Sequence, residues 1–174
     1  MSRRNPSFVL VALVLASGAS TAAVRHLGAH VHGQATVDIA VDQSHLQVGL
    51  HLPGHDAVGF EHPPASAAER KAFDHAMAVL KAGRWIEPSR EASCRLRKAD
   101  VSAPGLEGEA TGVHADMQAT YDFDCANAVK LAAVDLRLVE AFPSVQRIVT
   151  DVISAQGSAE QVLEHGVVRV DIAP

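Results

Sequence analysis

The chain has 174 residues and a formal net charge of −5, from 15 basic and 20 acidic side chains. That length suits one domain, and a mildly acidic chain lacks the basic surface typical of nucleic-acid-binding proteins. Aromatic residues make up only 4% of the chain, which also disfavours a base-stacking surface, whereas 48% hydrophobic residues argue against disorder.

Residues 1–23 are predicted to form a secretory signal peptide. Arg3 and Arg4 precede an unbroken apolar run at residues 8–16, and small residues follow as far as Ala23. The run is shorter than the roughly 20 residues that a bilayer-spanning helix needs, so a membrane anchor or a buried helix is the weaker interpretation. We expect cleavage after Ala23 and export of residues 24–174 as a domain that does not span a membrane.

The first structured part of the exported chain is predicted to be a β-hairpin. Apolar and polar residues alternate over residues 36–42 and again over 46–52, with a short polar turn between them. This period of two predicts antiparallel strands with one buried face. Pro53-Gly54 ends the second strand, and residues 55–64 are expected to form a loop.

A helix is predicted from Ala67 to Lys81. Ser66 and Glu69 have the spacing of a capping box, and Gly83 supplies a stop. The side chains expected to share the buried face of this helix are Phe73, Ala76, Met77 and Leu80.

The second half of the chain reads mainly as strands. They are expected at residues 94–101, 114–125, 131–138, 145–153 and 166–172, with a helical turn at 139–142 and a flexible loop at 101–113. Within 114–125 the odd-numbered residues should face the core, and the even-numbered ones, Asp116 among them, should face solvent. The fold class is therefore α+β, a mainly antiparallel sheet with one clear helix in a single domain.

The two cysteines, Cys94 and Cys125, are expected to form a disulfide. An even number of cysteines in an exported protein favours pairing, and a hairpin of the two strands would bring their ends together. A thiolate metal site is the alternative, which the absence of C-x-x-C spacing disfavours.

Patterns typical of enzymes are missing from the sequence. It contains no G-x-S-x-G elbow, no H-E-x-x-H helix, no P-loop and no G-x-G-x-x-G turn. We therefore expect a protein that is not an enzyme.

Histidine is the unusual residue: seven of the ten lie between residues 26 and 62. Neutral imidazole binds Zn(II), and also Cu(II) and Ni(II). His30 and His32 form a chelating pair if the chain is extended, although such a pair can also be a solvated terminus. The loop after the hairpin could return to this pair and add further donors. The candidate metal ligands are His30, His32, His62, Glu61, His55 with its neighbour Asp56, and His51 as a secondary ligand.

The other histidines are weaker candidates. His45, His75 and His165 are expected at the surface. His114, close to Glu109 in the preceding loop, is a possible second metal patch.

Several short segments in a fixed order resemble the periplasmic zinc-uptake accessory family typified by ZrgA. They are the H-V-H-G segment at 30–33, V-G-F-E-H at 58–62, the Cys94 and Cys125 pair, Y-D-F-D-C at 121–125, A-F-P at 141–143 and Gln156-Gly157. The resemblance implies a non-enzymatic periplasmic zinc-binding protein that works with an ABC-type zinc importer. The family's motif positions fall on His30, His32 and His62, with Glu61 adjacent.

One departure from the family concerns the segment between the two cysteine-bearing strands. Many members carry a long insertion rich in His, Asp and Glu there, whereas residues 101–113 contain no histidine. A compact site near the N-terminus is thus the leading hypothesis for zinc capture. The alternatives are a copper- or nickel-binding periplasmic protein, and a structural or interaction module whose histidines bind no metal.

Overall fold

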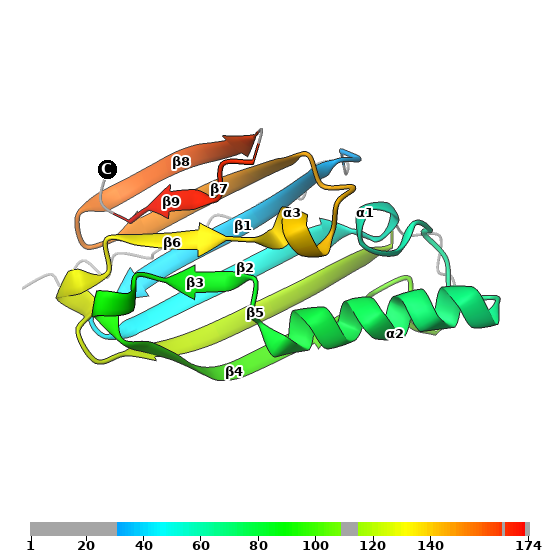
Figure 1. Cartoon of the computed structure of the whole chain (residues 1–174), viewed down its shortest axis with the longest axis horizontal. Helices are drawn as coiled ribbons and strands as arrows, with labels where there is room; N and C mark the ends of the chain where they lie inside the picture. Colours follow the sequence, from blue (N-terminus) through cyan, green and yellow to red (C-terminus); the bar gives the residue numbers. More distant parts are fainter. Residues whose placement is uncertain (1–30, 109–114, 165, 173–174) are drawn as a thin grey trace, which may run out of the picture.

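The computed structural model describes residues 31–108, 115–164 and 166–172. Its main feature is a six-stranded sheet with the strand order β4-β5-β2-β1-β7-β8 (Figure 1). Neighbouring strands are antiparallel except β1 and β7, which are parallel. The strands are β1 (Gln34–Asp42), β2 (His45–Pro53), β4 (Cys94–Ser102), β5 (Asp116–Cys125), β7 (Arg147–Ser154) and β8 (Gly157–Glu164).

A smaller antiparallel sheet and three helices complete the described fold. The small sheet has the order β3-β6-β9, from strands β3 (Ile86–Pro88), β6 (Ala133–Leu136) and β9 (Arg169–Asp171). The helices are α1 (Gly54–Val58), α2 (Ala67–Ala82) and α3 (Leu138–Ala141), with single 3-10 turns η1 (Arg90–Ala92) and η2 (Ala128–Lys130). None of these helices has the length and apolar character that a bilayer-spanning helix requires.

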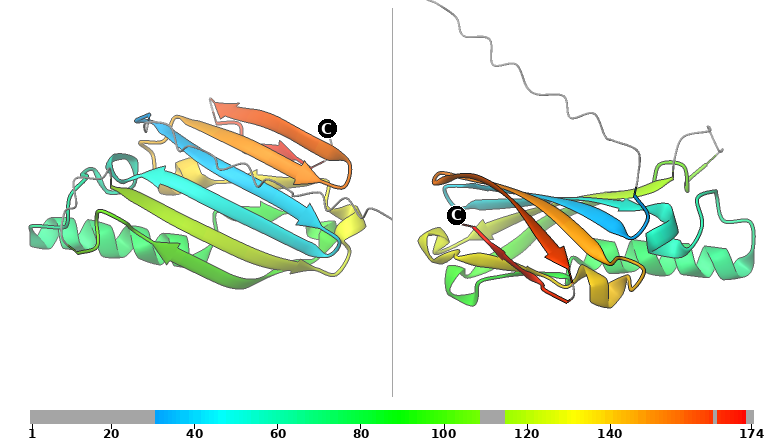
Figure 2. Two further views of the ribbon diagram at one scale, coloured as in Figure 1. Left: turned by 180° about the vertical axis from the view of Figure 1, so that it is seen from behind. Right: turned by 90° about the horizontal axis from the view of Figure 1, so that it is seen from above.

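The small sheet and α2 lie against the same face of the six-stranded sheet, and the core lies between the two layers (Figure 2, right). The opposite face of the six-stranded sheet, here called the open face, is uncovered by the described elements (Figure 2, left). Alternation along the strands explains this arrangement, because every second side chain is apolar and points into the core. Among the most buried side chains are Val37, Ile39, Leu46, Leu50, Met117 and Tyr121.

A buried hydrogen-bond network fixes the last turn of α2 to the sheet. The Tyr121 hydroxyl donates to the Leu80 carbonyl oxygen at 2.8 Å and accepts from Trp85 Nε1 at 3.1 Å. The two aromatic rings meet edge to face, with centroids 5.4 Å apart. Burial raises the pKa of Tyr121 to about 12, although the hydrogen bond from Trp85 acts in the opposite direction. The hydroxyl is therefore neutral and can both donate and accept.

The structure confirms the fold class and several of the predicted elements. The hairpin forms, and α2 begins at Ala67 with the full capping box: Ser66 Oγ accepts from the Glu69 amide, and Glu69 accepts from the Ser66 amide. Gly83 ends the helix with a φ of 62°, in the left-handed region that favours glycine. Cys94 and Cys125 are direct partners on β4 and β5 and form the disulfide, which rules out the thiolate metal site.

The structure differs from several expectations about local structure. The loop expected after Pro53 begins with the helix α1. The strand β8 was not anticipated, and the last predicted strand shrinks to β9. Asp116 is buried rather than exposed, because the turn at residues 103–107 packs over the start of β5 and Pro104 accepts a hydrogen bond from the Asp116 amide. The described part of the expected flexible loop thus forms a compact turn, with Ala103 and Leu106 buried.

Candidate functional site

The chain turns at Val31–Gly33 before entering β1. Gly33 has a φ of 81°, which other residues rarely adopt, and the Gln34 amide donates to the Val31 carbonyl. Hydrogen bonds hold Gly33 on both sides: its amide donates to Asp56 Oδ2 at 2.9 Å, and its carbonyl accepts from the amides of residues 146 and 147. The backbone beside His32 is therefore fixed in place.

The helix α1 lies at the same end of the molecule as this turn. The Gly54 amide donates to the Ala115 carbonyl oxygen at 2.7 Å, and a Cβ at residue 54 would come within 2.7 Å of that oxygen. Only glycine fits this close approach. Gly59 ends the helix with a φ of 87°, and its amide donates to the His55 carbonyl. The helix thereby presents His55, and the segment after it presents Glu61.

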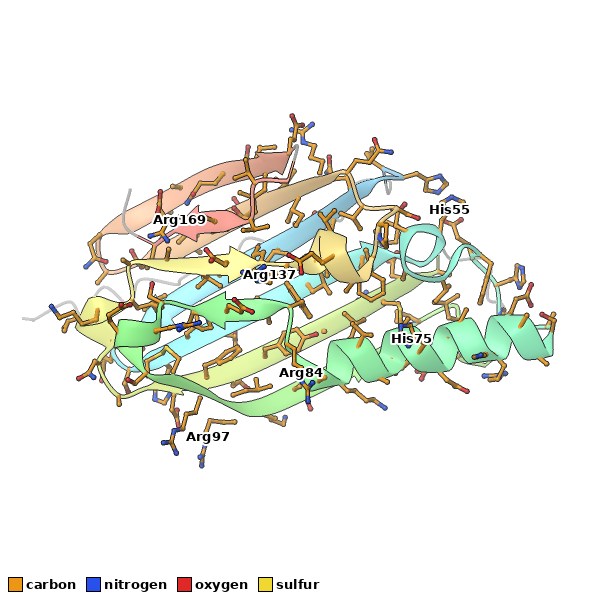
Figure 3. The ribbon with its side chains drawn as sticks, in the orientation of Figure 1. His55, His75, Arg84, Arg97, Arg137 and Arg169 are labelled. Atoms are coloured by element: carbon orange, nitrogen blue, oxygen red, sulfur yellow. A yellow bond between two sulfur atoms is a disulfide. The ribbon has the colours of Figure 1, made fainter. Side chains whose placement is uncertain are left out.

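Three predicted ligands come together here, and we call them the His32 cluster: His32, His55 and Glu61. His32 Nε2 lies 3.0 Å from Glu61 Oε1, and the rings of His32 and His55 are stacked with centroids 4.6 Å apart. Figure 3 shows His55 at the edge of the molecule, beside α1 and near the beginning of β1. The side chains of His32 and Glu61 are 59% and 32% exposed, so the cluster is open to solvent.

The donor atoms of His32 and Glu61 suit a divalent transition metal. A tetrahedral zinc ion with ligands at roughly 2.0–2.1 Å places neighbouring donors about 3.3 Å apart, close to the 3.0 Å found between these two atoms. His55 is stacked face to face on His32, so its ring must rotate before one of its nitrogens reaches the same ion. As it stands, no set of three or more His, Cys, Asp or Glu side chains within the described residues is arranged to hold a metal.

His62 points away from the cluster. Its ring stacks on Phe60 with centroids 5.2 Å apart, and its Nδ1 lies 3.0 Å from the Pro63 carbonyl oxygen. The ring also lies near Glu69, whose pKa is below its ordinary value chiefly because the Ala65 amide donates to it, with a smaller electrostatic contribution from His62. In this structure His62 is therefore associated with the start of α2, while Glu61 makes the contact with His32.

His51 lies on the open face of the sheet. It lines a groove of about 770 Å³ together with Asp38 and Gln118, and its buried Nδ1 has no hydrogen-bond partner within the described residues. It faces a different surface from the cluster at the start of β1.

Other histidines are placed as follows. His45 is exposed beside Asp124, with 3.1 Å between Nδ1 and Oδ1, and His75 is exposed on α2. His30, His114 and His165 lie outside the described residues. The predicted chelating pair of His30 and His32 and the predicted second metal patch at His114 therefore each include a residue outside the described part of the chain.

The role of Asp56 was not foreseen. It was a candidate oxygen donor for the metal, yet its Oδ2 accepts from the Gly33 amide and the residue is only 5% exposed. The signal in the sequence is that Asp56 directly follows the candidate ligand His55 and lies close to Pro53-Gly54, where α1 begins. An acidic residue in this position could have indicated a structural role beside metal binding.

Together these features define an α+β protein whose surface carries an imidazole–carboxylate pair suited to a divalent transition metal. A comparison with protein-family models is more specific: the model described as "ZrgA family zinc uptake protein" matches residues 29–172. Because the match covers most of the chain, the protein belongs to the ZrgA family and has a role in zinc uptake. No curated protein matches the chain. The family expected from the short segments is thus confirmed.

Proposed function

We propose that this protein is an exported accessory protein that captures Zn(II) in the periplasm and supports its uptake through an ABC-type importer. The observation that carries the proposal is the 3.0 Å contact between His32 Nε2 and Glu61 Oε1, with His55 stacked alongside, in a member of a zinc uptake family. Reversible coordination is sufficient for this role, and no catalytic step is required.

The same contact indicates how the ion would bind. A hydrogen bond between an imidazole nitrogen and a carboxylate oxygen needs a proton between them, and zinc would take the place of that proton. Protons therefore compete with the metal, and we expect zinc affinity to fall as the pH is lowered. Glu61 would neutralise part of the charge of the bound ion.

Zinc binding and thermal unfolding of the purified protein test the proposal. We expect one zinc ion per chain, and zinc at 100 times its Kd should stabilise the fold by about 2.7 kcal/mol, roughly 5–10 °C in Tm. The double variant His32→Ala/Glu61→Gln should lose both effects. His75→Ala, which removes an exposed imidazole on α2, should keep them.

Each other outcome of this experiment contradicts a defined part of the proposal. Equal zinc binding by the parent and the double variant would move the site away from the His32 cluster, with His51 the next candidate. If the parent binds no zinc and shows no thermal shift, the capture role is wrong and an interaction module remains.

Copper and nickel are the competing metals, because imidazole and carboxylate donors also bind Cu(II) and Ni(II). Met77 and Met117 are 8% and 0% exposed, so these core methionines do not offer a surface site for Cu(I). Competition experiments must allow for the intrinsically stronger binding of Cu(II). Recovery of the protein from cells with zinc rather than copper bound would support the zinc assignment.

Export and the uptake role are tested in cells. The sequence of residues 1–23 and the disulfide both suit an oxidising compartment outside the cytoplasm. We expect the protein in the periplasmic fraction, with a mass that corresponds to cleavage after Ala23. A strain without the protein should need more zinc to grow in chelator-treated medium. Growth equal to that of the parent strain, with the importer intact, would contradict the accessory role.

A further inference from the structure

Asp56 is a buried carboxylate within α1, one residue from His55, and it is 5% exposed. Burying a charged carboxylate is costly unless hydrogen bonds compensate for the lost water. Here Oδ2 accepts a hydrogen bond at 2.9 Å from the amide of Gly33, which lies 23 positions earlier in the chain. The carboxylate thus connects the helix that carries His55 to the turn that carries His32.

The carbonyl group of Gly33 is also held by hydrogen bonds. Its carbonyl oxygen accepts from the amides of Gln146 at 2.8 Å and Arg147 at 3.0 Å, at the beginning of β7. These bonds attach Gly33 to the sheet, while Asp56 attaches it to α1. The remaining freedom of His32, the preceding residue, is then mainly that of its own side chain.

We propose that Asp56 is a positioning residue for the His32 cluster, an inference that rests on the proposed zinc-binding function. Asp56 acts through Gly33: its hydrogen bond keeps the His32 backbone against α1, so that His32 meets Glu61 and stacks on His55. Asp56 is only 5% exposed and its Oδ2 accepts from the Gly33 amide, so its role in zinc binding is to orient a ligand. Residues that orient metal ligands typically contribute 10–100-fold to metal affinity.

Two substitutions of Asp56 test this role, because they distinguish the loss of its hydrogen-bond acceptor from a change in the size of its side chain. Asp56→Leu keeps a similar size and removes the acceptor, whereas Asp56→Asn keeps an oxygen that can accept from the Gly33 amide. In the protein expressed from its complete coding sequence, Asp56→Leu should weaken zinc binding by roughly 10–100-fold, and Asp56→Asn should restore most of the affinity.

A matched control removes another hydrogen bond between a side chain and the backbone. Ser89 Oγ donates to the Ala133 carbonyl and accepts from the Ala133 amide. Ser89 follows β3, whose end lies at the opposite side of the molecule from α1 (Figure 1). Ser89→Ala should lower stability without changing zinc affinity, so it distinguishes positioning from a general loss of stability.

A second measurement needs no metal. Nuclear Overhauser effects between the ring protons of His32 and His55 report the stacked arrangement, whose centroids are 4.6 Å apart. In the metal-free state these signals should be present in the parent, Asp56→Asn and Ser89→Ala, and lost in Asp56→Leu. If Asp56→Leu does not fold, as judged by Trp85 fluorescence, Asp56→Ala provides the same comparison.

The outcomes distinguish this inference from the proposed function. A parent that binds no zinc would overturn the proposed function and, with it, the metal-positioning role, whatever the ring signals show. A parent that binds zinc, together with an Asp56→Leu variant that keeps both the ring signals and the parent's affinity, would overturn the role of Asp56 alone. Loss of the ring signals and of zinc affinity in Asp56→Leu, with both kept in Ser89→Ala, would establish it.

Discussion

Replacing Tyr121 with phenylalanine tests whether the buried network holds α2 on the sheet. The substitution removes one oxygen atom and leaves the ring, which is fully buried. Trp85 Nε1, on a residue that is 4% exposed, then loses the acceptor of its hydrogen bond. The Leu80 carbonyl keeps a second donor, the Gly83 amide at 3.0 Å, and so loses only one of two bonds.

The magnitude follows from these two unequal losses. A buried donor left without an acceptor costs about 1–3 kcal/mol, and the loss of one bond from a carbonyl that keeps another costs about 0.5–1.5 kcal/mol. We therefore expect Tyr121→Phe to lower the free energy of unfolding by about 3 kcal/mol. For a domain of this size, that corresponds to roughly 6–12 °C in Tm.

Urea unfolding followed by fluorescence measures this directly, because Trp85 is the only tryptophan. Thr120→Val, at the neighbouring position on the open face, also removes one hydroxyl and should change stability by less than about 0.5 kcal/mol. A change below about 1 kcal/mol in Tyr121→Phe, with the fold intact, would refute the argument that these two bonds are needed.

Three further predictions concern the fold and the site. Because burial raises the pKa of Tyr121, the only tyrosine, to about 12, the folded protein holds this proton more tightly than the unfolded chain does. The stability that comes from burying the neutral Tyr121 hydroxyl is complete below about pH 10 and is lost as the pH rises towards 12, by up to about 3 kcal/mol. Because lysines titrate in the same range in both proteins, urea midpoints should fall more steeply in the parent than in Tyr121→Phe. Cys94→Ala/Cys125→Ala should lower the unfolding free energy by about 3.5–4 kcal/mol, since the bridge closes a loop between cysteines 31 positions apart, and chemical reduction of the parent should give the same urea midpoint. Gly54→Ala should cost about 1–3 kcal/mol and weaken zinc binding, because its Cβ would approach the Ala115 carbonyl, whereas Gly49→Ala, with its nearest neighbour at 3.7 Å, should be tolerated; equal midpoints for the two variants would contradict this.

The elements that could be predicted from the sequence depend on local patterns. The β1–β2 hairpin follows from strict alternation, and α2 follows from its capping box and its apolar face. In β8 only Leu163 is fully buried, because an edge strand has little of the core to cover, so its sequence lacks a clear alternation. Pairing with β7 makes this segment a strand, and no local pattern encodes that pairing.

The location of the candidate site could be predicted from the sequence, but the side chains that make the contacts within it could not. A loop that follows a hairpin returns to where the hairpin began, and this brought Glu61 and His55 to His32. Which of two adjacent side chains makes the contact depends on packing: the ring of His62 lies on Phe60, and this leaves Glu61 to face His32. Such a one-residue choice is set by tertiary contacts that spacing in the sequence does not record.

The exposure of the His32 cluster bears on how a bound zinc ion would be used. Structural zinc sites surround the ion with four protein ligands, whereas His32 and Glu61 offer two donors in contact and remain partly exposed. The other coordination positions would be filled by water or by ligands of a receiving protein, through which the ion could be exchanged. Because Gly33 and Gly54 are held by hydrogen bonds that do not involve the metal, the donors would stay together after the ion leaves. This arrangement favours a transferable cargo ion over a structural one.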